Sequence, residues 1–142
     1  MDVYDYERAT NLGQIAFKNK SYKNAFKHLE KASKLGNKVA QYTIALQYMG
    51  GYGVEKDYIK AYLWLNVASE AKVNKWRKLR DRVHNALSKQ QQDELKPHLE
   101  SYINKYGAKT QDVNCRKKSS TGSNIRVMTC IKSLDSGALR IN

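Results

Sequence analysis

Cysteine, proline and long apolar runs are all scarce in this sequence of 142 residues, which contains two cysteines and one proline. No apolar run approaches the roughly 20 residues that a membrane-spanning helix needs, so the sequence predicts no transmembrane segment. The N-terminal residues 1–8 are charged and lack the apolar core of a signal peptide. Two interpretations stay open: a cytoplasmic protein, or an exported protein whose leader is absent from the sequence as given.

Acidic residues are also scarce, at 13 against 26 lysines and arginines, which gives a formal net charge of +13. The excess is unevenly placed, because residues 1–70 carry +3 and residues 71–142 carry +10. A basic second half can attract nucleic acid, an anionic lipid surface or an acidic protein. Charge alone does not choose among these three, although no recognised motif supports nucleic acid.

The usual arrangements of catalytic and metal-binding residues are missing as well. The three histidines, His28, His84 and His98, have no partner ligands at the spacing of a metal site, so the sequence predicts no metal. Asp81 precedes His84 by one helical turn and could form half of an acid–base pair, but an exposed hydrogen-bonded pair explains the spacing better. No P-loop or G-x-S-x-G motif is present. We therefore expect no cofactor, no small-molecule substrate and no enzymatic activity.

An internal repeat is the strongest positive signal. Residues 22–33 align with residues 58–69 at a constant offset of 36, and tyrosine, lysine, alanine and serine recur at matched positions. Both segments have apolar residues at i, i+4 and i+7, which is one face of an α-helix. Small alanines on this face allow a neighbouring helix to approach closely. The matched positions are Ala25, Leu29 and Ala32 in the first segment and Ala61, Leu65 and Ala68 in the second.

A glycine-rich loop interrupts the second unit. The helices that precede the repeated segments align at an offset of 32 rather than 36, so the second unit has the longer loop. Residues 50–57 supply this loop, and their glycines permit positive φ and end the preceding helix. Asp57, the last residue of the loop, is predicted to cap the next helix.

Residues 40–65 carry a family pattern. They begin Ala-Gln-Tyr-Thr-Ile-Ala-Leu-Gln-Tyr, continue with Gly-x-x-Gly-Val, and end Lys-Asp-Tyr-x-Lys-Ala-Tyr-Leu-Trp-Leu. This pattern resembles a Sel1-like repeat, a branch of the tetratricopeptide-type repeats. Residues 12–35 resemble a shorter unit of the same type, and residues 77–91 are similar to the helices that often follow the last Sel1-like unit. The resemblance covers roughly residues 9–105 and implies an all-α fold, a short right-handed α-solenoid of antiparallel helix pairs.

The resemblance and the helical periodicity together place a helical repeat domain at residues 1–106. Ser88 and Gln91 form a capping box that opens its last helix, and Pro97 is expected to kink or break that helix. We expect six helices, near residues 4–19, 22–35, 38–49, 57–70, 72–87 and 89–105.

Composition changes after the helices, and residues 107–142 are predicted to form a C-terminal extension. Cys115 and Cys130 flank a polar turn, which is the simplest pattern for one local disulfide, and two free thiols are the alternative. Strand-like alternation at residues 124–130 favours a small disulfide-tied hairpin or an extended tail. The segment is also similar to a Cys–Thr-Gly-Ser/Thr–Cys motif of small exported bacterial proteins. A disulfide would imply an oxidising compartment.

In tetratricopeptide-type folds the first helix of each pair lines a concave groove, so the resemblance implies a binding site there. Apolar side chains in such a groove suit an extended peptide or a helix of a partner protein. The alternative is that so few units are too short for a groove and that these side chains simply pack. The positions carried over from the family are Thr10, Gln14, Phe17, Val39, Tyr42, Leu46, Met49, Arg77, Asp81 and His84.

A second candidate surface is a basic helix face, although the usual role of such a face is solvation. Trp76 lies within the same stretch, and half-buried packing explains it better than a role as a surface anchor. The residues of the basic face are Lys72, Lys75, Lys78 and Arg82.

These features predict a non-enzymatic scaffold for protein–protein recognition in the bacterial envelope, exported to the periplasm and favouring an acidic partner. An immunity-type inhibitor of a toxin and an assembly factor for an envelope machine are two forms of this prediction. The alternative is a protein that binds the cell wall, another anionic surface or nucleic acid. A cytoplasmic location is the alternative to export.

Overall fold

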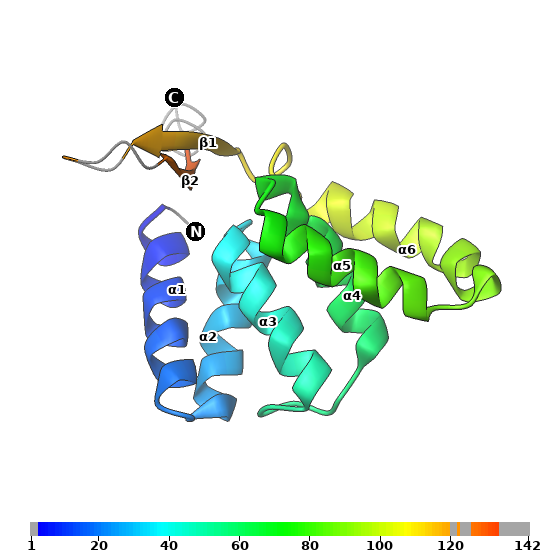
Figure 1. The fold of residues 1–142 in the computed structure, drawn as a ribbon. Helices are drawn as coiled ribbons and strands as arrows, with labels where there is room; N and C mark the ends of the chain where they lie inside the picture. The colour runs from blue at the N-terminus through cyan, green and yellow to red at the C-terminus, as the bar shows by residue number, and fades with distance from the viewer. Residues whose placement is uncertain (1–2, 120–121, 123–125, 134–142) are drawn as a thin grey trace.

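The computed structural model describes residues 3–119, 122 and 126–133 (Figure 1). Within these residues, helices occupy the chain up to Tyr106 and a two-stranded antiparallel sheet follows. The elements are α1 (Val3–Lys18), α2 (Tyr22–Lys34), α3 (Lys38–Gly50), α4 (Tyr58–Ala68), the 3-10 helix η1 (Ser69–Ala71), α5 (Asn74–Ala86), α6 (Lys89–Tyr106), β1 (Val113–Ser119) and β2 (Arg126–Lys132).

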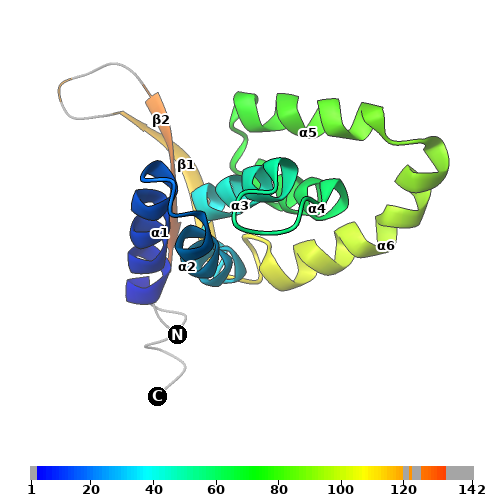
Figure 2. The same cartoon turned by 90° about the horizontal axis from the view of Figure 1, so that it is seen from below.

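The first four helices form two antiparallel pairs that stack side by side, as predicted (Figure 1). α1 packs against α2, α2 against α3, and α3 against α4. The last two helices differ from this pattern. Both pack against α4, on either side of it, and meet where α5 ends and α6 begins (Figure 2).

The predicted helix boundaries have local causes that the structure confirms. The Asp57 carboxylate accepts a hydrogen bond from the Lys60 amide at 3.0 Å, so Asp57 caps α4. Ser88 and Gln91 form the reciprocal capping box that opens α6, with bonds of 3.1 Å and 2.9 Å. Asn37 caps α3 in the same manner.

Two glycines are required where backbones come close. Gly53 has a φ of +73°, and a Cβ atom there would lie 2.4 Å from the carbonyl carbon of Tyr22. Gly13 lies where α1 crosses α2, and a Cβ atom there would lie 2.5 Å from Cγ of Leu29. A larger side chain would push α1 away from α2 at position 13 and would push the glycine-rich loop away from the start of α2 at position 53.

The repeated apolar face forms the core, as predicted from the offset of 36. Leu29 and Leu65 are fully buried, together with the four alanines of the matched positions. On the far side of α4, Trp64 packs against Tyr102 and Tyr106, with ring centroids 5.2 Å and 5.0 Å apart. These aromatic contacts fasten α6 to the second repeat unit.

Two details of the predicted helices are wrong. The fourth helix ends at Ala68 rather than near residue 70, and the fifth begins at Asn74 rather than at residue 72. The reason is Lys72, which has a left-handed φ of +58° and turns the chain between η1 and α5. Pro97 does not break α6, which continues through it from Lys89 to Tyr106 and curves (Figure 2).

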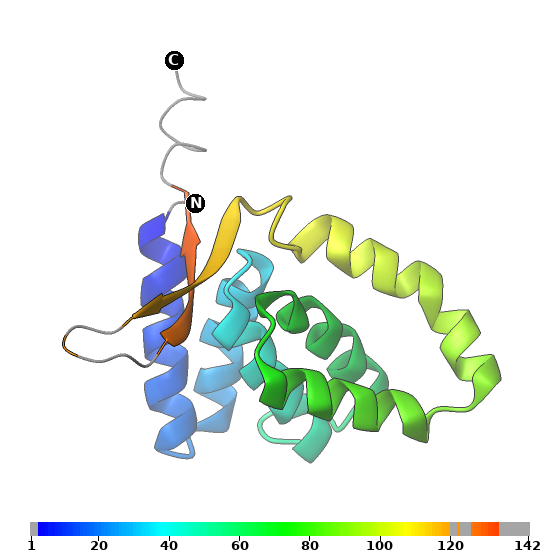
Figure 3. The same cartoon turned by 45° about the horizontal axis from the view of Figure 1, so that its top comes forward.

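The strands form a hairpin in which Cys115 lies directly opposite Cys130, and the two are joined by a disulfide. The disulfide prediction is therefore confirmed, and the free-thiol alternative is wrong. One face of the hairpin packs on a small apolar cluster that contains Tyr6 of α1 and Leu35 at the end of α2. The hairpin thus lies beside the first repeat unit although it follows the last helix (Figure 3).

A buried lysine holds the hairpin in this position. Lys132 is only 8% exposed, and its ammonium group donates hydrogen bonds to the carbonyl oxygens of Leu35 at 2.9 Å and Gln111 at 2.7 Å. The Gln111 side chain accepts a third bond at 3.1 Å. Burial lowers the pKa of Lys132, and these three acceptors compensate the lost hydration of the ammonium group.

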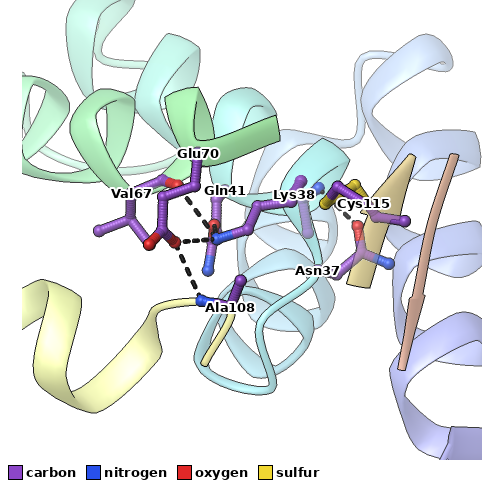
Figure 4. Close-up of a disulfide and its surroundings, with 9 residues drawn as sticks. Asn37, Lys38, Gln41, Val67, Glu70, Ala108 and Cys115 are labelled. Atoms are coloured by element: carbon purple, nitrogen blue, oxygen red, sulfur yellow. Dashed lines mark hydrogen bonds and ion pairs between the residues drawn. A yellow bond between two sulfur atoms is a disulfide. The ribbon is translucent and has the colours of Figure 1, made fainter. Parts of the chain in front are cut away.

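Lys38, at the start of α3, is a second buried lysine, and it holds the connection that leads to the hairpin (Figure 4). Its side chain is 1% exposed, and Nζ lies 2.7 Å from Glu70 Oε1 and 3.0 Å from the Val67 carbonyl oxygen. Gln41 supplies the third acceptor at 3.1 Å. The same Glu70 oxygen accepts a bond from the Ala108 amide at 2.9 Å. One partly buried ion pair therefore joins α3, the 3-10 helix η1 that follows α4, and the connection that leads to β1.

Candidate functional site

A cavity of about 480 Å³ opens where the helical body meets the hairpin. Its floor comes from the first turns of α1 and α3, one wall comes from the turn between η1 and α5, and the other wall comes from the hairpin. The lining residues are Tyr6, Asn37, Lys38, Val39, Ala71, Lys72, Val73, Asn74, Trp76, Lys117, Arg126, Val127, Met128 and Cys130.

Helix packing positions the α5 wall of this cavity. The left-handed turn at Lys72 directs the chain into α5, and the first turns of α5 and α3 line the same cavity. Trp76 stacks on Tyr42 of α3 with ring centroids 4.9 Å apart and an interplanar angle of 12°. Packing fixes Trp76, as expected from the sequence, yet the same side chain lines the cavity.

The cavity is cationic. Lys72, Lys117 and Arg126 are exposed, and none of them forms an ion pair with another residue in the described part of the chain. No aspartate or glutamate is among the lining residues. Lys38 adds no free positive charge to the cavity, because its ammonium group is paired with Glu70. A negatively charged group that enters the cavity would therefore meet three free cations and no carboxylate.

Apolar surface accompanies these cations. Val39 on the floor is 43% exposed, and Trp76 and Met128, on opposite walls, are half-buried beside it. Burying such exposed aliphatic surface favours association, because apolar area is removed from water. The cavity can therefore hold a carboxylate and an adjacent apolar side chain at the same time.

Tyr6 forms the buried part of the floor, at 3% exposed. Burial raises the pKa of Tyr6 to about 12, and the negative charge of Glu7 acts in the same direction. The phenol is therefore neutral at physiological pH. The ammonium group of Lys132 lies 5.9 Å from the centre of its ring.

The ten groove positions carried over from the family lie in three helices, α1, α3 and α5, and only some of them are near the cavity. Val39 lines the cavity, and Tyr42 supports it through its stacking on Trp76. Leu46 and Met49 lie farther along α3 and are half-buried. The groove assignment stays a prediction for these four residues of α3.

The groove positions of α1 make contacts within the fold. The Thr10 hydroxyl is buried and donates a hydrogen bond to the carbonyl oxygen of Tyr6 at 2.9 Å. The Gln14 side chain accepts a bond from Thr43 at 3.3 Å. The Phe17 ring packs against aromatic rings of α2 and of the glycine-rich loop.

The groove positions of α5 also have partners. Arg77 bonds to the side chain of Asn74, and Asp81 pairs with Arg80 at 2.9 Å. The Nδ1 atom of His84 lies 2.8 Å from the hydroxyl oxygen of Tyr62. Asp81 and His84 thus have different partners, so the geometry gives no acid–base pair between them.

The predicted basic face is divided in two. Lys75, Lys78 and Arg82 lie exposed along α5, whereas Lys72 precedes that helix and belongs to the cavity. The residues that sequence reasoning missed are Lys117, Arg126 and Met128 of the hairpin. A signal for them was present, because residues 113–134 contain five lysines and arginines and no acidic residue.

Within residues 3–119, 122 and 126–133, no group of three or more histidines, cysteines or carboxylates is placed to hold a metal ion. No helix in the same described part of the chain combines the length and the apolar character that crossing a membrane requires.

Comparison with solved structures identifies the fold. The chain is similar to c5321, a protective antigen present in uropathogenic Escherichia coli strains that displays a Sel1-like repeat fold, with 26% sequence identity and a TM-score of 0.63. The chain has the Sel1-like repeat fold. The match covers 82% of this chain and 27% of the E. coli protein, so this chain corresponds to about a quarter of that protein. No family model matches the sequence, and no curated protein matches it.

The Sel1-like repeat fold supports a protein-interaction scaffold in general terms. Its helices α1 and α3 are the first helices of the two packed pairs, and both contribute to the cavity floor. In this chain the disulfide-tied hairpin adds a wall to that face.

Proposed function

We propose that this protein is a binding scaffold, without catalytic activity, that holds an acidic segment of a partner protein in the cavity between the helices and the hairpin. The observation that carries the proposal is the pairing of three free cations with exposed apolar surface around a concave site that has no acidic lining residue. Specific protein recognition uses this combination, in which apolar burial gives affinity and complementary charge gives specificity.

We also propose that the protein acts after export, in the bacterial envelope. The disulfide between Cys115 and Cys130 supports this proposal, because such bonds persist in oxidising compartments and are rare in the cytosol. A cytoplasmic location would require a fold that tolerates loss of this bond.

The experiment that tests the binding role uses two variants of equal charge. The first, Lys72→Gln/Lys117→Gln/Arg126→Gln, removes the cavity cations. The second, Lys75→Gln/Lys78→Gln/Arg82→Gln, removes the same charge from the exposed face of α5. Each oxidised protein serves as bait in a lysate of the source organism, at low and at moderate salt.

We expect one protein to be captured at moderate salt by the wild type and by the α5 variant, and to be lost from the cavity variant. Equal loss from both variants would show that net charge, rather than the cavity, drives capture. Recovery of only salt-labile nucleic acid or wall material would overturn the proposal in favour of a binder of anionic surfaces, because that attraction falls steeply with ionic strength.

A further inference from the structure

The backbone of β2 presents unpaired groups at the cavity. The amide of Ser133 donates to the carbonyl oxygen of Asp112 at 2.8 Å, so these opposite residues form a hydrogen-bonded pair just beyond the strands. Antiparallel ladders alternate between hydrogen-bonded and non-hydrogen-bonded pairs. Cys115 and Cys130 therefore form a non-hydrogen-bonded pair, and their Cα–Cα distance of 4.0 Å agrees with the closer spacing of such pairs.

The same alternation settles the direction of the other backbone groups. Met128 and Arg126 follow Cys130 at steps of two, so their amide and carbonyl groups also point away from β1. Within the described residues, no backbone or side-chain hydrogen bond outside the ladder reaches these groups. All three residues line the cavity. One open edge of the two-stranded sheet therefore borders the candidate site.

We propose that the partner binds by adding an extended strand to this edge of β2. The inference rests on the proposed function and adds how the acidic segment of the partner binds, which is as an extended strand beside β2. Strand addition takes its affinity from main-chain hydrogen bonds and its specificity from alternate side chains. Arg126, Met128 and Cys130 offer the main-chain groups, and the cavity receives the side chains on one face of the added strand.

Charge complementarity selects the occupant. The side chains of Lys117 and Arg126 lie on the face of the hairpin toward the helices, whereas Arg116 and Lys118 lie on the opposite face. A strand that alternates acidic and apolar residues therefore finds cations on whichever face its acidic side chains occupy. An apolar side chain that points toward Trp76 completes the recognition.

A second copy of the chain is the occupant that this charge excludes. Residues 113–134 contain five lysines and arginines and no acidic residue, so two hairpins placed edge to edge would repel each other. Cations on an edge strand are a general way to prevent self-association through unpaired edges. Here the same charges leave the edge open to a strand of opposite sign.

The test uses synthetic peptides of about ten residues that alternate glutamate with valine or leucine, because such peptides are extended and acidic. Binding to the full, oxidised protein is measured by fluorescence polarisation, and matched peptides with lysine in place of glutamate are the control. In the peptide that binds best, each backbone amide is then methylated in turn. We expect methylation at every second residue to weaken binding by about tenfold or more, and methylation at intervening residues to have little effect.

Two variants of the protein at Met128 test whether the backbone of β2 forms these hydrogen bonds. Met128→Pro removes one outward-pointing amide and no ladder hydrogen bond, so an edge strand tolerates it. Met128→Ala removes the side chain and keeps the amide. We expect the proline variant to lose peptide binding by about tenfold or more and the alanine variant to lose less. Should the proline variant fail to fold, the methylation series still decides the question.

The outcomes separate this inference from the proposed function. Methylation that weakens binding at every position or at none would overturn strand addition, while the dependence on the cavity cations would retain the scaffold. Equal binding of glutamate and lysine peptides, or binding of neither, would overturn both. Binding to phosphatidylglycerol vesicles without binding to the peptides would also overturn strand addition and assign the hairpin to anionic lipid.

Discussion

Lys38 and Lys72 both border the cavity, but their ammonium groups are in opposite environments. The ammonium group of Lys38 is buried with three acceptors, and burial lowers its pKa. That of Lys72 is exposed and has no carboxylate partner in the described part of the chain. Lys132, at the base of the hairpin, has a buried and hydrogen-bonded ammonium group like that of Lys38. Lys117, at the cavity wall, is exposed like Lys72.

The difference separates architecture from recognition. A buried charge costs free energy unless its hydrogen-bonding capacity is satisfied, so Lys38 and Lys132 fix the helices and the hairpin relative to each other. An exposed cation costs little and stays available to a ligand. A net charge of +13 counts both kinds alike. Only the contacts show that the cavity cations are free while the two buried lysines are already committed.

The largest expected loss of stability follows from replacing Lys38, the buried lysine. Lys38→Met leaves a side chain of similar length but deprives Glu70 of its cation and the Val67 carbonyl of a donor. We expect the free energy of unfolding to fall by about 3–5 kcal/mol, as measured by urea unfolding, because a half-buried carboxylate is left without its partner.

The matched control for that substitution is Lys34→Met on α2. Lys34 is exposed and pairs with Glu30 at 3.9 Å across one helical turn. A surface pair of this kind contributes about 0.3–0.5 kcal/mol. Equal destabilisation by the two variants would show that the Lys38 cluster does not hold the fold.

The disulfide is the next largest contribution. Cys115→Ser/Cys130→Ser removes a bond that closes a loop with a sequence separation of 15. In the chain-entropy model such a bond stabilises by about 3 kcal/mol. We expect the loss to be local, so that amide exchange in β1 and β2 accelerates while exchange in α2 to α4 is unchanged. Equal acceleration in the helices would mean that the hairpin and the helices unfold as one unit.

A smaller effect is expected in alkaline solution, from Tyr6 beneath the hairpin. Its folded-state pKa of about 12 lies above the ordinary value of 10.0, so the unfolded chain loses the phenolic proton first. Stability is therefore fully present below about pH 10 and is lost as pH rises toward about 12. A difference of about two in pKa corresponds to at most about 2.7 kcal/mol.

The measurement is urea unfolding across this pH range for the wild type, Tyr6→Phe and Tyr58→Phe. The phenylalanine at position 6 keeps the apolar contacts and cannot ionise, so its stability should fall less steeply. Tyr58 is 51% exposed, and the variant at that position should follow the wild type. Parallel curves for all three proteins would contradict the assignment of alkaline loss to Tyr6.

The sequence predicts well what local periodicity and capping control. The faces that contain Leu29 and Leu65, the cap at Asp57 and the box at Ser88 all depend on residues within a few turns of one another. Lys72 shows the limit of this reasoning, because a helical pattern of basic residues continues across a left-handed turn that does not belong to the helix. Propensity alone gives no signal for a lysine in that conformation.

The site could be predicted only in part. Val39 was identified because it belongs to α3, whose pattern is clear. The cavity itself depends on contacts between distant segments, such as the bond from Lys132 to Leu35, which are 97 residues apart. The burial of Lys38 likewise depends on Glu70, 32 residues away. No local pattern encodes such contacts, so a lysine in the sequence does not reveal whether it is buried or free.

The smallest expected change in stability tests the free member of the comparison. Lys117→Met is expected to change the free energy of unfolding by less than about 0.5 kcal/mol, because Lys117 is exposed and pairs with no acidic residue in the described segments. The same substitution should weaken binding of an acidic peptide, since one of the three cavity cations is lost. Destabilisation by Lys117→Met as large as that by Lys38→Met would show that the hairpin cations stabilise the fold. The distinction between lysines that hold the fold and lysines that are free to bind a ligand would then be wrong.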